Sequence, residues 1–193
     1  MMIAIIKYNA GNVKSVENAI SRLGFDCVVT DDKEKIFSAD KVIFPGVGEA
    51  SSAMSYLKKY QLNDVIISLK QPVLGICLGQ QLMCNHSEEG DTTCLGIFNA
   101  NVKKFPPIDL VPHMGWNSLS ELKGNLFNGI SVKDNVYFVH SYYAEVVEET
   151  IAVCNYMLPF SAAMQKNNFY GTQFHPEKSA SVGEKILKYF LDL

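Results

Sequence analysis

The chain has 193 residues, of which 48% are hydrophobic and 19% charged, and its formal net charge is −3. This length and composition predict a globular protein with a sizeable core and exclude a disordered chain. The slightly acidic balance, without a basic cluster, argues against nucleic acid as a partner. We expect a single domain over residues 1–193.

The apolar start of the chain and its cysteines indicate where the protein works. The run from Met1 to Ile6 ends at Lys7, too soon for a signal peptide or a membrane span, so we expect no membrane association. Five cysteines without a Cys-x-x-Cys pair favour reduced thiols in a cytoplasmic protein. We expect neither a metal site nor a cofactor. The cysteines are Cys27, Cys77, Cys84, Cys94 and Cys154.

The first half of the chain predicts alternating strands and helices. Apolar, β-branched runs predict strands at 2–7, 25–30, 41–44 and 72–76. Helical spacing predicts helices over 13–23, 50–60, 62–69 and 78–85, with a short helix inside 31–40. The turn at 9–12 lacks the glycine spacing of a phosphate loop, so an ordinary βα turn is expected. This alternation is typical of βαβ units in a parallel sheet.

After residue 93 the pattern changes to short alternating runs separated by turn signals. Such runs predict antiparallel strands at 94–102, 136–139, 142–147, 151–156, 160–165 and 169–174. Residues 86–90 and 105–117 are expected to be loops, and 181–193 a closing amphipathic helix. The predicted fold class is therefore α/β, a mostly parallel central sheet flanked by helices with an appended antiparallel portion.

The stretch Gly75-Ile76-Cys77-Leu78-Gly79 lies between a predicted strand and a predicted helix. A nucleophile with glycine two residues away on both sides is the nucleophile-elbow pattern, here with cysteine in place of serine. Side chains at the glycine positions would collide in so sharp a turn. A helix N-terminus next to the sulfur favours thiolate. The alternative is a buried cysteine in a tight turn.

Two further stretches carry chemistry that a cysteine nucleophile needs. Pro45-Gly46-Val47-Gly48 is a glycine-rich turn whose backbone N–H groups suit an oxyanion, although a plain Pro-Gly turn is the alternative. In His175-Pro176-Glu177 the histidine can move a proton. The carboxylate, on the same side of a strand end, can orient the ring.

In order and spacing these three motifs resemble the class I (triad) glutamine amidotransferases, and the resemblance covers nearly the whole chain. Two more stretches are similar to the glutaminase subunits of imidazole glycerol phosphate synthases. They are Pro112-His113-Met114-Gly115-Trp116-Asn117 and Tyr137-Phe138-Val139-His140-Ser141-Tyr142. The resemblance implies that glutamine is hydrolysed through a thioester and that the ammonia is passed on.

The resemblance also implies roles for particular residues. Cys77 would be the nucleophile, His175 the proton carrier and Glu177 its orienting group. Backbone N–H groups of Val47 and Leu78 would form the oxyanion hole. Glutamine would be held by Gly48, Gln81, Glu89, Ser141 and Tyr142. For Glu89, a solvated charge in a loop is the alternative.

The implied partner is a (β/α)8-barrel cyclase subunit in a heterodimer. It would use the ammonia to make imidazole glycerol phosphate and aminoimidazole carboxamide ribonucleotide in histidine biosynthesis. The candidate docking residues are Asn12, Trp116, Tyr137 and Lys178, although Trp116 could instead be a core residue. His86 is expected at the surface, and His113 and His140 in hydrogen-bonded structure.

Three other functions stay open from the sequence. A paralogous subunit could supply ammonia to a different synthase with the same glutaminase chemistry. A γ-glutamyl hydrolase of similar elbow geometry would work without a partner. A catalytically silent scaffold subunit is disfavoured because Cys77, His175 and Glu177 are all present.

Overall fold

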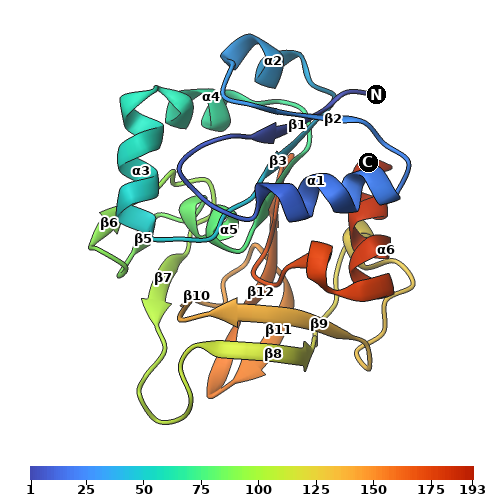
Figure 1. Cartoon of the computed structure of the whole chain (residues 1–193). Helices are drawn as coiled ribbons and strands as arrows, with labels where there is room; N and C mark the ends of the chain where they lie inside the picture. The colour runs from blue at the N-terminus through green and yellow to red at the C-terminus, as the bar shows by residue number, and fades with distance from the viewer.

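The computed structural model describes residues 1–193, and a seven-stranded sheet forms its centre (Figure 1). The strand order is β11-β12-β13-β4-β3-β1-β2. Five of these strands pair in parallel: β1 (Ile3–Ile6), β2 (Cys27–Thr30), β3 (Lys41–Phe44), β4 (Val73–Ile76) and β13 (Phe169–Thr172). The antiparallel portion adds β11 (Thr150–Tyr156) and β12 (Leu158–Lys166) at one edge. The expected α/β fold class is confirmed.

Helices cover both faces of the central sheet, so its strands are buried on both sides. On one face lie α1 (Val13–Arg22) and α6 (Ala180–Leu191). The other face carries α2 (Lys33–Ser38), α3 (Ala50–Lys59), α4 (Leu62–Ser68) and α5 (Leu78–Leu82). Because side chains alternate along a strand, β1 sends Ile3 and Ile5 into one core and Ala4 and Ile6 into the other.

Two small sheets flank the central one. The first has the order β10-β7-β5-β6, formed by β5 (His86–Ser87), β6 (Thr92–Thr93), β7 (Asn101–Lys104) and β10 (Tyr142–Ala144). The second is an antiparallel pair, β8 (His113–Ser118) and β9 (Asn135–His140), seen at the lower part of Figure 1. Two 3₁₀ turns, η1 (Asn125–Phe127) and η2 (Pro176–Lys178), complete the elements. None of the helices combines the length and the hydropathy that a membrane-spanning segment requires.

Several boundaries predicted from the sequence were wrong. The expected loop at 105–117 contains most of β8. Its alternation is masked because the exposed positions include the apolar Met114 and Trp116, while polar His113 is buried. The expected loop at 86–90 begins with β5, and the run at 94–102 forms a strand only from Asn101 onward. The helix after Cys77 ends at Leu82 rather than near Asn85.

The turn between β4 and α5 holds Cys77 in a strained backbone conformation, with φ 53° and ψ −107°. Glycine is required on both sides of it. A methyl group on Gly75 would lie 2.8 Å from the backbone nitrogen of Gln80, and one on Gly79 would overlap the carbonyl of Phe44. An added side chain at either glycine would therefore collide with main-chain atoms, and rearrangement of neighbouring side chains cannot relieve that collision.

We expect Gly79→Ala to lower the free energy of unfolding by about 1–3 kcal/mol or more, the usual cost of forcing extra volume into a packed core. Chemical denaturation of the variant measures this loss. Ser21→Ala, at an exposed position of α1, is the control and leaves the midpoint unchanged. A Gly79→Ala protein as stable as the wild type would contradict the close approach of α5 to β3.

Candidate active site

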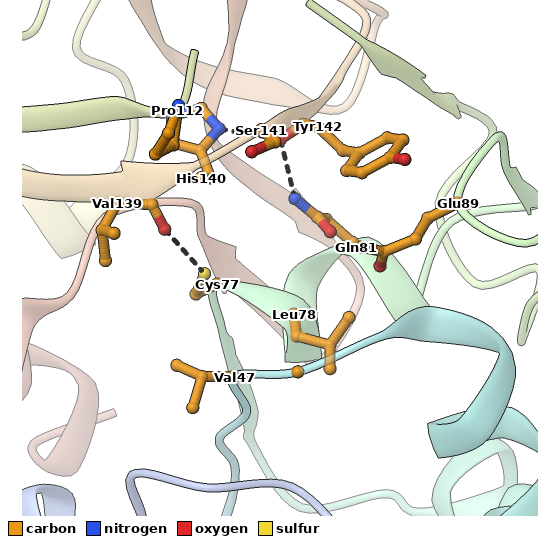
Figure 2. Close-up of a pocket in the computed structure, with 11 residues that line it drawn as sticks. Val47, Cys77, Leu78, Gln81, Glu89, Pro112, Val139, His140, Ser141 and Tyr142 are labelled. Carbon is orange, nitrogen blue, oxygen red and sulfur yellow. Dashed lines mark hydrogen bonds between the residues drawn. The ribbon is translucent and has the colours of Figure 1, made fainter.

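A pocket of about 280 Å³ opens beside Cys77 (Figure 2). It contains all five residues expected to bind glutamine and both expected oxyanion residues. Three further residues line it for which the sequence had predicted no role in binding or catalysis: Pro112, Val139 and His140. The full lining is Val47, Gly48, Cys77, Leu78, Gln81, Glu89, Pro112, Val139, His140, Ser141 and Tyr142.

The sulfur of Cys77 has two polar neighbours from different parts of the chain. The side-chain amide of Gln173 donates to Sγ from 3.6 Å. On the β9 side, Sγ lies 3.9 Å from the carbonyl oxygen of Val139, which accepts from the thiol (Figure 2). Cys77 is 6% exposed, so the sulfur is reached only through the pocket.

His175 and Glu177 form a buried pair directly after β13. His175 Nδ1 lies 2.7 Å from Glu177 Oε1, and both side chains are inaccessible to solvent. The contact does not arise from an extended strand end as expected. Pro176 instead begins the 3₁₀ turn η2, which folds the carboxylate back onto the ring. His175 Nε2 has no hydrogen-bond partner in the protein.

Burial by itself would lower the pKa of His175, but its neighbours reverse that effect. The charge on Cys77 is the larger cause, and the hydrogen bond and charge of Glu177 add to it, so the pKa rises to about 10. The ring therefore holds a proton at neutral pH. A protonated imidazole close to a cysteine is a setting that favours the thiolate, the form in which cysteine acts as a nucleophile.

Asn12 touches this pair, which the sequence did not reveal. Its side-chain amide donates to Glu177 Oε1 and lies 3.4 Å from His175 Nδ1. Asn12 begins α1 with φ 72°, a left-handed conformation that asparagine adopts more readily than most residues. The half-buried Asn12 therefore lies between the protein surface and the carboxylate of Glu177.

The glycine-rich loop lies against Cys77 but does not present two free N–H groups. The N–H of Leu78 donates to the carbonyl of Gly46 at 3.2 Å. The neighbouring peptides are fixed, because Tyr8 donates to the Pro45 carbonyl at 2.7 Å and Gly11 N–H donates to the Val47 carbonyl at 3.1 Å. The carbonyl oxygen of the Gly46–Val47 peptide thus faces the N–H of Leu78, where an oxyanion was expected to bind.

Gln81 and Glu89 are brought together at the far side of the pocket (Figure 2). Gln81 Nε2 donates to the Tyr142 carbonyl and to Gln173 Oε1, both at 2.8 Å. Glu89 Oε2 accepts from the N–H of Ala50 at 2.8 Å. The pKa of Glu89 is raised overall, because burial outweighs the opposing effect of the hydrogen bond from Ala50. Glu89 is thus a pocket residue and not a freely solvated charge.

Two buried histidines form a directed hydrogen-bond chain that begins in the wall of the pocket. His140 Nδ1 lies 2.7 Å from the Tyr142 carbonyl, which can only accept, so Nδ1 carries the proton. His140 Nε2 then accepts from His113 Nδ1 at 3.0 Å. Burial lowers the pKa of His113 to about 4 and that of His140 to about 3. Both rings are therefore neutral near pH 7, in agreement with the structural role expected for them.

The candidate docking residues lie around the rim of the same region. Trp116 and Tyr137 are paired across β8 and β9 with ring centroids 5.9 Å apart. Trp116 is 55% exposed, which excludes the core alternative, and Lys178 is exposed on η2. Tyr137 is half-buried, and its carbonyl accepts from the N–H of His175.

Comparison with known proteins identifies the class. Residues 4–192 match the family model described as glutamine amidotransferase class-I. The chain belongs to this family of glutamine amidotransferase enzymes. It is 58% identical to "Imidazole glycerol phosphate synthase subunit HisH" of Bacteroides fragilis, with all of both chains covered. It is 46% identical to the protein of the same name from Escherichia coli K12, again over all of both chains.

Solved structures agree on the fold. A putative GMP synthase protein from Thermoplasma acidophilum has a TM-score of 0.77 at 20% identity, covering 100% of this chain and 92% of that one. PurLQS from Thermotoga maritima has a TM-score of 0.71 at 15% identity, covering 99% and 97%. At these identities the likeness establishes the α/β architecture alone.

The buried histidine chain makes stability depend on pH. An imidazole with an unfolded pKa near 6.5 and a lower folded pKa binds a proton only after unfolding. The contribution of these two rings to stability is therefore full above pH 6.5 and falls as the pH drops toward about 4 and then 3. Each ring adds at most about 1.4 kcal/mol per pH unit to the slope.

We expect His113→Gln and His140→Gln each to make this acid slope shallower, as measured by urea denaturation between pH 4 and 7. His86→Gln is the matched control, since His86 is partly exposed and pairs with Asp91 at the surface. An unchanged slope in both buried-site variants would show that these rings do not stay neutral in the folded protein.

Proposed function

We propose that this chain is the glutaminase subunit of an imidazole glycerol phosphate synthase and works in the cytoplasm. The observation that carries the proposal is the position of Cys77 on a strained elbow, at the base of a pocket and within electrostatic reach of the buried His175–Glu177 pair. Membership of the amidotransferase family and 58% identity to a named subunit support the same reaction.

In the proposed reaction the sulfur of Cys77 attacks the side-chain amide carbon of glutamine. His175 gives its proton to the departing ammonia, which leaves a γ-glutamyl thioester. The neutral ring then takes a proton from water, the hydroxide attacks the thioester, and glutamate is released. Glu177 and Asn12 hold the ring in the orientation that both transfers need.

Recognition of glutamine follows from how Gln81 is hydrogen-bonded. Both amide hydrogens of Gln81 are used inside the protein, so the atom left for a ligand is the acceptor Oε1. With the carboxylate of Glu89 this suits the α-ammonium group of the substrate. We assign the α-carboxylate to backbone groups of Gly48, Ser141 and Tyr142, which line the same pocket.

The oxyanion hole requires one peptide to turn over. Rotation of the Gly46–Val47 peptide would release the N–H of Leu78 and aim the N–H of Val47 at the site, so a single movement supplies both donors. Its neighbours are anchored through Tyr8 and Gly11, which confines the movement to that peptide. We propose that the structure represents the resting state and that ligand and partner favour the rotated one.

The relatives are named as subunits, so a partner is expected to receive the ammonia. We propose that this partner is a (β/α)8-barrel cyclase and that it docks over Asn12, Trp116, Tyr137 and Lys178. Exposed apolar side chains on and before β8 continue this face, as a protein interface needs. They are Ile108, Leu110, Val111 and Met114.

Glutamine turnover tests the function. We expect slow ammonia release by the pure chain and a rise of about 10²-fold or more with the barrel cyclase and its nucleotide, because each oxyanion donor is worth about 10²–10³ in rate. Cys77→Ser abolishes both rates, whereas the control Cys27→Ser, on β2, keeps them. Fast turnover that ignores the cyclase would indicate an independent γ-glutamyl hydrolase instead.

Calorimetric titration with the cyclase tests the docking face. We expect Trp116→Ala to weaken binding by about tenfold or more, since buried aromatic anchors commonly contribute above 1 kcal/mol. Lys178→Ala should weaken binding less and reduce its salt dependence. Phe37→Ala removes an equally exposed aromatic side chain from α2 and serves as the control. Unchanged affinity in both rim variants would place the interface elsewhere.

A further inference from the structure

A buried side-chain amide lies against the nucleophile and has no role in the reaction described so far. Gln173 is fully buried, follows β13 directly and precedes His175 by two residues. Its Nε2 lies 3.6 Å from the sulfur of Cys77, and its Oε1 lies 2.8 Å from Nε2 of Gln81. This one amide therefore joins the reacting atom to a residue of the substrate pocket.

The direction of these hydrogen bonds is fixed by a backbone carbonyl. The Tyr142 carbonyl can only accept, so the atom of Gln81 that faces it must be the NH₂ group. The second hydrogen of that NH₂ group points at Gln173, whose facing atom must therefore be the acceptor Oε1. The remaining group of Gln173, its NH₂, is left facing the sulfur. No other orientation satisfies all three contacts.

A donor aimed at sulfur favours the charged form of the nucleophile. An N–H group stabilises a thiolate more than a thiol, because hydrogen bonds to charged acceptors are roughly twice as strong as neutral ones. The Val139 carbonyl on the other side acts in the opposite sense, since it can accept only from the protonated thiol. The donor from Gln173 therefore counteracts the preference of the Val139 carbonyl for the protonated thiol.

We propose that Gln173 is a further catalytic residue, which stabilises the thiolate of Cys77 and couples it to Gln81. The inference rests on the proposed function in taking Cys77 as the nucleophile. When the α-ammonium of glutamine donates to Gln81 Oε1, the amide of Gln81 becomes a better donor to Gln173. Gln173 in turn becomes a better donor to the sulfur. Substrate binding thereby activates the nucleophile through two side chains.

Alkylation by iodoacetamide in the absence of glutamine tests the sulfur contact. In Gln173→Met, which keeps the length of the side chain but lacks the donor, we expect the alkylation rate at pH 6–7 to fall about tenfold. This corresponds to a shift of the alkylation midpoint by about one pH unit, while the rate at high pH stays unchanged. With the cyclase present, kcat falls and KM for glutamine rises, because Gln81 loses an acceptor.

Thr172→Val is the matched control. It changes the preceding buried residue on β13, whose hydroxyl has no partner, and it should leave the alkylation profile and turnover unchanged. A Gln173→Met protein with a lower melting temperature but a wild-type alkylation profile would show a purely structural role and overturn the proposal.

A second measurement needs no substitution at Gln173. In the wild-type protein the side-chain NH₂ resonances of Gln173 should shift with pH at the same midpoint as alkylation, and the shift should vanish in Cys77→Ala. Resonances that do not move through the titration would overturn the inference. If they do move while the wild type hydrolyses no glutamine with its cyclase, the proposed function fails and the sulfur contact stands.

Discussion

The close approach of α5 to β3 and β4 is the constraint on which the rest of the site depends. Gly75 and Gly79 let the backbone double back so tightly that a methyl group at either position would meet main-chain atoms. The turn forces Cys77 into a backbone conformation with positive φ and points its sulfur out of the sheet. Parallel strands then bring the other contributors to the same edge, because β3, β4 and β13 lie side by side and end there.

Around that sulfur the polar groups are arranged by burial and hydrogen bonding more than by helix charge. The helix that follows Cys77 has only five residues, so its dipole is short. Beside the sulfur lie the buried ring of His175, held by Glu177, and the amide of Gln173. In the wall of the pocket, His140 and Gln81 both donate to the carbonyl of Tyr142. If one of these side chains rotated, a neighbouring group would in most cases lose its hydrogen-bond partner.

Much of this fold was predictable because its signals are local. Apolar, β-branched runs predicted the parallel strands β1 to β4, and the residue types around Cys77 and His175 indicated the site. The run at 169–174 was expected to be antiparallel, but β13 is antiparallel only to β12 and pairs in parallel with β4. The start of β8 was missed because Met114 and Trp116 are exposed, which removes the alternation that marks a strand. The contacts of Asn12 and Gln173 join residues more than ninety positions apart, and no local pattern encodes them. Leu78 was expected to offer a free N–H, but its bond to Gly46 depends on the loop conformation.

The carbonyl of Gly46 in front of Leu78 has a metabolic consequence. A glutaminase that hydrolysed glutamine without its partner would release ammonia that no acceptor uses. Here a single backbone oxygen, that of Gly46, accepts the N–H of Leu78, so in the proposed mechanism this donor is unavailable until the peptide rotates. At about 10²–10³ in rate for one such donor, the resting enzyme of the proposed mechanism would hydrolyse glutamine at least about a hundred times more slowly than the assembled one.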